Sequence, residues 1–477
     1  MAVINKDWLL IMDKREQYKR IYRFFSSVLI IGMLTGIFAY VWYSIFADND
    51  DILVKTFFRR GNYVLIALYA VILFLFYRIY GAHKVGYMRI LEAAYTQVLS
   101  VLCTNVFTYF QLCLIGRWKF LAHSMTILWM TAFQVVLVLI WSFVARFGYT
   151  KLYPPRELLV VYGKYSPKSL INKLAARQDK YTIGGTISIK RDIDEIKARI
   201  LESGGVLLMD IPAEIRNQLL KFCFRQNIRC YTTPKISDIM LRSSEEIHLF
   251  DTSLLLSRNT GLSAEQQFLK RAFDIVFSLI FLLVFSPFML LIALAIKVCD
   301  GGPVFFTQDR LTQDGKVFKL YKFRSMYVNN QPSEYCLTRE NDKRVTPVGK
   351  IIRNIHFDEL PQIINILKGD MSFVGPRPEC PHLAAEYQQI VPEFDFRLKM
   401  KAGLTGFAQV YGKYNTTPLD KLKLDLVYIE NYSFRLDLKL ILLTFKILFQ
   451  KENTEGIKDW QTSAATEENL EKIGKEQ

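Results

Sequence analysis

The sequence predicts a protein of three parts: a helical membrane domain, a small α/β domain, and a larger domain that mixes helices with strands. Three observations predict this order. Four apolar runs occupy residues 1–150, strands alternate with helices over 151–260, and a further apolar run leads into mixed elements over 268–450. The composition agrees, because 51% of the 477 residues are hydrophobic. Residues 451–477 are charged and polar, and we expect a disordered tail there.

The four apolar runs each approach the ~20 residues that a helix needs to cross a bilayer. The runs are Tyr22–Phe46, Tyr63–Tyr80, Ala93–Ile115 and Met125–Val144. The third is interrupted by Thr96, Gln97, Asn105 and Gln111, which we expect to face neighbouring helices rather than lipid. Twelve basic residues lie in the N-terminal segment, the second connection and the exit, against five in the other two connections. Because basic residues favour the cytoplasmic side, both ends of this domain are predicted to be cytoplasmic.

Residues 151–260 alternate between strand and helix patterns, beginning with a buried strand over Glu157–Tyr162. This alternation predicts a parallel, doubly wound sheet. The turn after the first strand, Gly163–Ser169, has a single glycine where a dinucleotide site would need GxGxxG. Lys164, Ser166, Lys168 and Ser169 remain alternative phosphate contacts. We favour a regulatory or structural role for this domain.

The next apolar run, Ile275–Ile296, has Ser286-Pro287 near its centre and follows Lys270-Arg271. Proline removes a helical hydrogen bond and clashes with the preceding turn. In lipid the freed carbonyl needs a partner, and the Ser286 hydroxyl is placed to supply one. A fifth span would put everything that follows outside the cytoplasm, on the opposite side from the preceding domain. The residues alone support two geometries about equally: a fifth span, or a helix that enters the membrane and returns on the same face. In the second geometry, Lys270 and Arg271 would anchor the helix at the membrane interface.

Two adjacent acids, Asp358 and Glu359, precede apolar residues at helical spacing, so we expect a short helix to carry the acids at its start. Adjacent helical side chains do not face each other. The two carboxylates can therefore address two targets, for example one phosphorus atom and one metal ion. Gly375-Pro-Arg-Pro378 predicts a stiff turn that offers a guanidinium to phosphate oxygens. A capped surface helix followed by a proline loop is the plainer interpretation, and the nearby arginines favour a phosphate site.

Several of these motifs carry a family resemblance. They are Lys270-Arg271, Ser286-Pro287, Lys322-Phe-Arg-Ser-Met326, Asp358-Glu-Leu-Pro-Gln362 and Lys368–Pro378. They resemble the bacterial monotopic phosphoglycosyl transferases, also called undecaprenyl-phosphate sugar phosphotransferases. The resemblance covers about residues 268–450. Four N-terminal spans and a Rossmann-like domain are also similar to the long, WbaP/WcaJ-like subclass.

The resemblance implies a reaction and a set of roles. A UDP-sugar would give its sugar 1-phosphate to undecaprenyl phosphate, with release of UMP, in the first membrane step of exopolysaccharide, capsule or O-antigen synthesis. Asp358 would form a covalent phosphosugar intermediate, Glu359 would help to hold Mg²⁺, and Ser286-Pro287 would break a re-entrant helix over residues 270–297. Expected substrate or phosphate contacts are Arg353, Arg377, Pro376, Pro378, Lys322, Arg324, Gln362 and Asp370. An alternative role for Asp370 is to orient Arg377, and that choice stays open.

The net charge of +16 is placed mainly beside apolar runs, so we expect membrane lipids and no nucleic acid as partners. We also expect a homodimer in the bacterial inner membrane, multi-pass, with the catalytic domain facing the cytoplasm. Two other classes stay open: a sugar-nucleotide epimerase or oxidoreductase that works through the α/β domain, and a non-catalytic assembly scaffold. Ala402, Phe407 and Tyr411 depart from the family pattern, so the sequence does not identify the sugar.

Overall fold

The computed structural model describes residues 18–47, 59–175, 177–257, 261–327, 344–412 and 416–448. The chain divides into two compact units, Met1–Thr233 and Pro234–Gln477. The predicted tail over 451–477 lies outside the described residues. The limits predicted for the three domains stay predictions.

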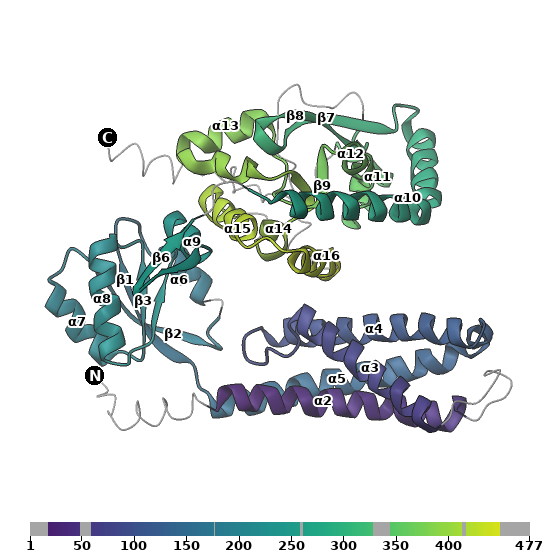
Figure 1. Ribbon diagram of the computed structural model, residues 1–477, viewed down its shortest axis with the longest axis horizontal. Helices are drawn as coiled ribbons and strands as arrows, with labels where there is room; N and C mark the ends of the chain where they lie inside the picture. Colours follow the sequence, from purple (N-terminus) through teal and green to yellow (C-terminus); the bar gives the residue numbers. More distant parts are fainter. Residues whose placement is uncertain are drawn as a thin grey trace. The chain divides into compact units, whose positions relative to one another are not determined.

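Long apolar helices form the first part of the N-terminal unit (Figure 1). They are α2 (Lys19–Val41) with its π-helical continuation η1 (Trp42–Phe46), α3 (Arg59–Tyr80), α4 (Ile90–Ile115), and α5 (Ser124–Leu152), which follows the 3-10 turn η2 (Lys119–His123). Within the described part of the chain, five helical segments are long and apolar enough to cross a membrane: these four and α10 of the other unit. Their outer faces expose large apolar side chains such as Phe24, Phe133 and Leu283, as lipid contact requires.

Polar side chains of α4 face the inside of the helix group. Thr96, Gln97 and Asn105 are buried, which confirms the prediction for them, whereas Gln111 is half-buried. The amide of Asn105 donates to Thr131 Oγ1 at 2.8 Å and to Gln134 Oε1 at 2.7 Å. Each bond joins α4 to α5. Away from water, these polar groups need partners on neighbouring helices, so the network fixes how the helices pair.

A four-stranded parallel sheet of order β2-β1-β3-β4 follows the helices. Its strands are β1 (Arg156–Tyr162), β2 (Tyr181–Ser188), β3 (Val206–Met209) and β4 (Cys230–Thr232), and the connecting helices are α6 (Lys168–Ala175), α7 (Ile193–Glu202) and α8 (Ala213–Arg225). At the end of β1, a Cβ on Gly163 would lie 1.9 Å from the carbonyl oxygen of Asp210. The close approach of the chain after β3 therefore requires this glycine, and no bound phosphate is needed to account for it.

The C-terminal unit combines helices with three two-stranded sheets. The strands pair as β5 (Glu245–Leu249) with β6 (Thr252–Leu256), β7 (Phe305–Leu311) with β8 (Val317–Phe323), and β9 (Met371–Val374) with β10 (Ala402–Thr405). The helices are α9 (Ile236–Arg242), α10 (Ala264–Asp300), α11 (Pro347–Asn354), α12 (Gln362–Lys368), α13 (Pro381–Ile390), α14 (Phe407–Tyr411), α15 (Pro418–Glu430) and α16 (Phe434–Leu448). Met371, Phe394 and Leu426 belong to the buried core that joins these elements.

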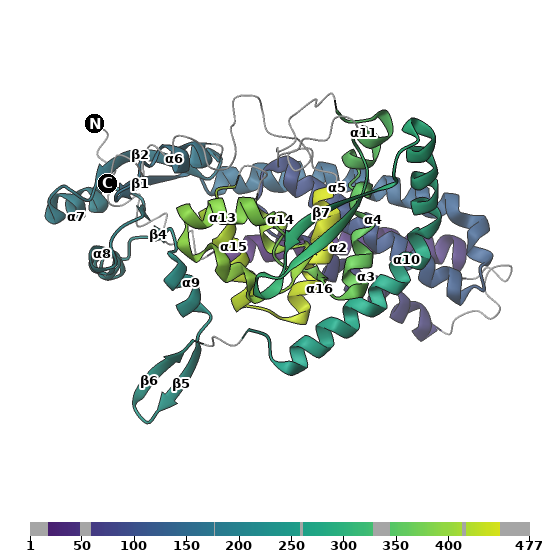
Figure 2. The same cartoon turned by 90° about the horizontal axis from the view of Figure 1, so that it is seen from above.

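The helix α10 holds Pro287 inside its length and changes direction along its course, as two views show (Figures 1 and 2). Proline has no N–H to offer the carbonyl of Leu283, and Ser286 Oγ donates to that carbonyl at 3.3 Å. The prediction for the Ser286 hydroxyl is confirmed. In the first half of α10, Phe273 packs edge-on against Phe373, with the ring centroids 6.3 Å apart. In the second half, Ile296 shares a buried cluster with Ile352 of α11. Both halves therefore pack on the same unit.

Candidate functional site

The two acids lie in the 3-10 turn η5 (Phe357–Glu359), between α11 and α12. His356 has a left-handed backbone with φ 57°, which separates the turn from α11. Pro361 then serves as the N-cap of α12. The short helix expected to carry Asp358 and Glu359 is thus a single 3-10 turn, and the α-helical part begins only at Gln362, after Pro361. The turn presents the two carboxylates at the edge of β8, with which it is in contact.

Glu359 accepts hydrogen bonds from two cations. Lys322 Nζ of β8 lies 2.7 Å from Glu359 Oε1, and Arg377 Nη2 lies 3.3 Å from the same oxygen. The Glu359 side chain is only 15% exposed. Burial by itself would raise the pKa of Glu359, but Lys322 and Arg377 hold it well below its usual range. Glu359 is therefore a carboxylate that stays ionised.

The pKa of Asp358 is shifted in the opposite direction. Burial raises its pKa above the usual range and the neighbouring charge of Glu359 adds to this, while Lys322 and Arg353 oppose it. Two adjacent acids thus have pKa values that are pushed apart by their surroundings. Such a separation is what an active site uses to give two carboxylates different tasks.

The loop that carries Arg377 is fixed by its own main chain. Four successive carbonyls, from Pro376 to Glu379, each accept a hydrogen bond from a residue elsewhere in the unit. The donors, in that order, are Gly403 N at 2.9 Å, Arg397 Nη2 at 2.9 Å, Arg310 Nη1 at 3.0 Å and Leu311 N at 2.9 Å. Pro376 and Pro378 add fixed φ angles. The predicted stiff turn is present, and Arg377 leaves it toward Glu359.

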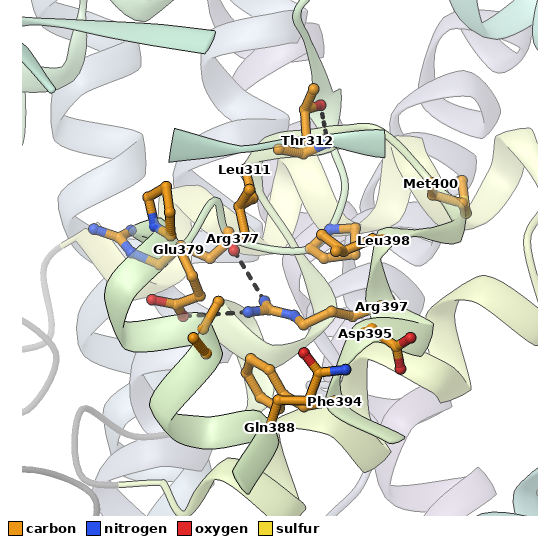
Figure 3. Close-up of a pocket in the computed structure, with 15 residues that line it drawn as sticks. Leu311, Thr312, Arg377, Glu379, Gln388, Phe394, Asp395, Arg397, Leu398 and Met400 are labelled. Carbon is orange, nitrogen blue, oxygen red and sulfur yellow. Dashed lines mark hydrogen bonds and ion pairs between the residues drawn. The ribbon is translucent and has the colours of Figure 1, made fainter. Parts of the chain in front are cut away.

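Beneath this loop lies a buried ionic network that single-residue reasoning did not find. Arg397 Nε donates to Asp425 Oδ2 at 2.9 Å, and its Nη1 donates to Glu379 Oε1 at 3.3 Å. Figure 3 shows the guanidinium between Glu379 and the carbonyl of Arg377. Lys421 also bonds to Glu379. Burial would raise the pKa of Glu379, but Lys421 and Arg397 lower it to about 2. The partners are far apart in the chain, and each residue alone has the appearance of an ordinary surface charge. No short sequence motif therefore predicts the network.

A pocket of about 190 Å³ lies beside the same loop (Figure 3). Its lining includes Arg377 but neither Asp358 nor Glu359. Most of its walls are apolar, including Leu311, Phe394 and Met400, with Arg397 and Glu379 as buried charges. The acids and the pocket are therefore separate features that share one loop.

The remaining predicted contacts are spread around the acids. Arg353 lies in the last turn of α11, and Gln362 is buried at the start of α12. Arg324 is 2% exposed, and its backbone N–H donates to the carbonyl of Val304 at 2.9 Å. Asp370 contacts Asn365 through Oδ2 at 3.4 Å. The structure thus brings Lys322 and Arg377 to Glu359, whereas Asp370 takes part in the turn after α12.

Lys270 and Arg271 contact the protein interior. Lys270 Nζ lies 2.7 Å from Asp437 Oδ2 of α16, and both side chains are buried. Arg271 donates to the carbonyls of Ile366 and Leu367 at 2.7 Å each, at the C-terminal end of α12. These residues hold the first half of α10 to the unit that carries the acids. Their contact with a membrane interface stays a prediction.

A hard divalent cation would find carboxylate oxygens at η5. Among the described residues, no group of three or more His, Cys, Asp and Glu side chains could hold a metal ion. Mg²⁺ is commonly bound by one or two carboxylates together with substrate phosphates, rather than by a cage of protein ligands. Asp358 and Glu359 fit that kind of site, and Glu359 is suitably ionised. Its Oε1 would then have to be shared with Lys322 and Arg377, or released by them.

Comparisons with known proteins place the chain among sugar transferases. Residues 265–451 match the family described as "Bacterial sugar transferase". An Aeromonas hydrophila protein named UDP-N-acetylgalactosamine-undecaprenyl-phosphate N-acetylgalactosaminephosphotransferase is 29% identical over 89% of this chain and 93% of its own length. The Escherichia coli UDP-glucose:undecaprenyl-phosphate glucose-1-phosphate transferase is 43% identical over 39% of this chain, and the match spans 41% of that relative.

A shorter relative shows how large the shared part is. The Rhizobium leguminosarum exopolysaccharide production protein PSS is 42% identical over 36% of this chain, and this match covers 91% of the relative. The shared part thus makes up nearly all of that relative. The family match begins within α10 and includes η5 and the Arg377 loop. The chain therefore belongs to the bacterial sugar transferase family.

Proposed function

We propose that this protein transfers a sugar 1-phosphate from a UDP-sugar to undecaprenyl phosphate and releases UMP, as an early step of polysaccharide synthesis. The observation that carries this proposal is the pair of adjacent acids with opposite pKa shifts, of which Glu359 bonds to two cations. Phe357 of the same turn packs against Phe285 of the bent helix α10. The names of the relatives in E. coli and A. hydrophila support the substrate classes. The two names do not identify the sugar that this protein uses, because one names UDP-glucose and the other UDP-N-acetylgalactosamine.

Asp358 is the nucleophile in this proposal. One of its oxygens forms a bond to the β-phosphorus of the UDP-sugar, and the bond from that phosphorus to the bridging oxygen breaks. The bridging oxygen and its electron pair leave with UMP, and the sugar phosphate stays on Asp358. A carboxylate is a workable covalent acceptor. Burial, which raises the pKa of Asp358, also makes the ionised form more reactive than a solvated one.

The second step returns Asp358 to its starting state. A phosphate oxygen of the polyprenyl acceptor attacks the same phosphorus, and the bond from phosphorus to the Asp358 oxygen breaks. Lys322 and Arg377 are positioned to offset negative charge on the phosphoryl oxygens, because both lie within 3.3 Å of Glu359 Oε1 at the neighbouring residue. Mg²⁺ held at Glu359, when bound, would neutralise the charge of the diphosphate.

The proposed topology has four spans, α2 to α5, and a re-entrant α10. Both halves of α10 pack on the unit that carries the acids: Lys270 pairs with Asp437, and Ile296 clusters with Ile352. A helix that crossed a bilayer would carry its far end away from that unit, so these contacts support the re-entrant alternative. We place the protein in the bacterial inner membrane, with the acids on the cytoplasmic side and a Rossmann-like domain between α5 and α10, and we propose a homodimer.

The test uses the purified full-length protein in detergent, free of undecaprenyl phosphate until it is added. In the absence of undecaprenyl phosphate, candidate UDP-sugars with Mg²⁺ should give at most one UMP per protein and a sugar-labelled protein. Adding undecaprenyl phosphate should restore turnover and remove the label. Asp358→Asn should abolish both the burst and the label.

Asp314→Asn is the matched control, because Asp314 is exposed and has a left-handed backbone that asparagine tolerates. Label-free protein, with UMP formed only when the acceptor is present, would indicate direct transfer instead. No UMP release from any UDP-sugar would overturn the proposed activity.

A further inference from the structure

A group of basic side chains gathers around Tyr87 in the N-terminal unit. Tyr87 lies in the connection between α3 and α4, and 45% of its surface is exposed. The guanidinium carbon of Arg23 lies 4.9 Å from the centre of its ring, and Lys180 Nζ lies 4.3 Å from that centre. Lys180 is also 4.9 Å from the ring of Tyr181. Two cations, one from α2 and one from the residue before β2, thus share one aromatic ring.

Neither of these cations has a carboxylate partner among the residues that the structure describes. The contacts of the Lys180 ammonium are the two rings, and Arg23 uses its Nε to bond the carbonyl of Lys19 at 3.1 Å. Other positive groups lie close, since Lys19 is within electrostatic range of both Arg156 and Lys180. Lys180 is half-buried, and burial lowers its pKa. A ring offers each cation only about 0.5–2 kcal/mol, so the rings do not fully compensate the charges of Arg23 and Lys180.

The connection that carries Tyr87 is held in place by a separate set of contacts. Arg177 Nη2 donates to the carbonyl of Tyr87 at 2.7 Å, and Arg146 Nη1 donates to the carbonyl of Met88 at 3.3 Å. Asp179 accepts hydrogen bonds from both of these arginines. The carboxylate oxygens of Asp179 are therefore bonded to the two arginines that fix the loop. The charge of Asp179 also partly opposes the burial that lowers the pKa of the adjacent Lys180, without a direct ion pair. Arg23 and Lys180 therefore contact the ring of a tyrosine whose backbone is fixed by other residues, Arg177 and Arg146.

The position of the cluster relative to the apolar helices suggests the kind of anion. Arg23 lies one turn after the first residue of α2, and Tyr153, over which Lys19 stacks at 5.1 Å, follows the end of α5. Both helices are long and apolar enough to span a membrane. Residues at the ends of such helices lie at the level of the lipid head groups, where anionic lipids attract Lys and Arg.

We propose that Arg23 and Lys180, with Lys19 beside them, bind the phosphate of an anionic lipid head group against Tyr87. Phosphate supplies several acceptor oxygens, which suits two or three converging donors. The site is separate from the acids of the C-terminal unit. It ties a lipid of the surrounding membrane to the start of the parallel sheet, through Lys180, and to the first apolar helix, through Arg23.

The experiment measures lipid retention by the full-length protein in detergent, using native mass spectrometry. Equal amounts of phosphatidylglycerol and phosphatidylcholine are added, and the wild type should retain phosphatidylglycerol preferentially. Arg23→Gln and Lys180→Gln should each weaken that retention about fivefold, and the double variant about 25-fold. Lys180→Arg should keep it, because the charge and the donors are preserved. Lys197→Gln is the matched control, since Lys197 pairs with Asp194 at 2.9 Å in the same unit.

A phosphate titration decides the source of the phosphate. Inorganic phosphate is added to the protein with its retained lipid: if it displaces phosphatidylglycerol at low millimolar concentration and binds in its place, the site takes a small anion and the lipid assignment is overturned.

Equal retention of phosphatidylglycerol by the wild type and the double variant overturns the site itself. Thermal unfolding of each variant is recorded in parallel. Weaker retention in Lys180→Gln together with full retention in Lys180→Arg supports the proposal even if Lys180→Gln unfolds more easily.

Discussion

Arg397 Nη2 donates to the main-chain carbonyl of Arg377 at 2.9 Å. The Arg397 side chain is 2% exposed, whereas that of Arg377 is 45% exposed and reaches Glu359. A buried arginine thus holds the backbone of an exposed one. The buried network of Glu379 and Asp425 thereby fixes the direction in which Arg377 leaves its loop.

Replacing Arg397 by lysine tests that relationship. Lysine keeps the charge but cannot reach three acceptors as a planar fork does. We expect Arg397→Lys to lower the free energy of unfolding by about 1.5–3 kcal/mol, the contribution of a charge-assisted hydrogen bond. We also expect slower UMP release, because Arg377 is less well positioned. Thermal unfolding and steady-state kinetics measure the two effects.

The control for this experiment is Arg191→Lys, since the Arg191 side chain is 68% exposed and pairs with Glu195 at 3.6 Å. It should change neither property. A normal melting temperature and normal turnover in Arg397→Lys would mean that the loop does not depend on the fork.

The parts of the site that could be predicted are those whose partners share a short motif. Asp358 and Glu359 are adjacent, and the two prolines around Arg377 announce a stiff loop by themselves. The Ser286 hydroxyl could be predicted because the carbonyl that Pro287 frees lies within one helical turn. The contact between Lys322 and Glu359 could not, since 37 residues separate them and only the fold brings β8 beside η5.

Replacing Asp358 by asparagine should stabilise the folded protein at neutral pH. Burial raises the pKa of Asp358, so its ionised form costs stability at pH values above the unfolded pKa of about 3.9. Below that value the acid is protonated in both states, and the difference between Asp358→Asn and wild type should disappear. Melting temperatures at pH 7 and at pH 3 measure this. A lower melting temperature at pH 7 would contradict it.

Glu359→Gln should behave in the opposite way. Lys322 and Arg377 hold the pKa of Glu359 below its usual range, so its ionised form stabilises the fold above the unfolded pKa of about 4.3. That contribution is lost as the pH falls through the lower, folded pKa. Glu359→Gln should therefore melt below the wild type at pH 7, and the gap should narrow toward acid. Equal shifts in the two variants would mean that the two acids do not differ in environment.

The pH dependence of UMP release should report Asp358, because Glu359 stays ionised to lower pH. We expect kcat/KM to fall on the acid side with the loss of a single ionised group, at a midpoint above the usual pKa of aspartate, about 3.9. Lys322→Met removes a cation that lowers the pKa of Asp358, so this acid limb should move to higher pH. In Lys322→Arg, which keeps the positive charge, the midpoint of the acid limb should stay closer to that of the wild type. An acid limb that does not move in Lys322→Met would assign the titration to another group.

The re-entrant course of α10 is tested with single cysteines in the full-length protein, in sealed membrane vesicles of known orientation. Cysteines placed near Lys270 and near Gly301, at the two ends of α10, should react with a membrane-impermeant reagent from the cytoplasmic side only. The seven native cysteines, including the exposed Cys299, are first replaced by serine. Labelling of the Gly301 site from outside would make α10 a fifth span.

The fold of the C-terminal unit shows where sequence reasoning ends. A strand pattern over the residues of β8 and the apolar run of α10 can be identified locally. The pairing of Lys270 with Asp437 joins positions 167 residues apart, and neither residue indicates a partner on its own. Only the packing of α10 against α16 creates the buried site that forces the two charges to pair.

That pairing gives the last prediction. The Lys270 and Asp437 side chains are 7% and 3% exposed, and Tyr428 donates its hydroxyl to Asp437 Oδ1 at 2.8 Å. Lys270→Met leaves a buried carboxylate without its cation, which should lower the free energy of unfolding by about 3–5 kcal/mol. Asp437→Leu should cost a similar amount, because it leaves the ammonium buried. The double variant Lys270→Met/Asp437→Leu should recover much of the loss, since two buried apolar side chains replace the pair. Unfolding of all four proteins closes a double-mutant cycle, and two losses that simply add would mean that the pair does not hold α10 to α16.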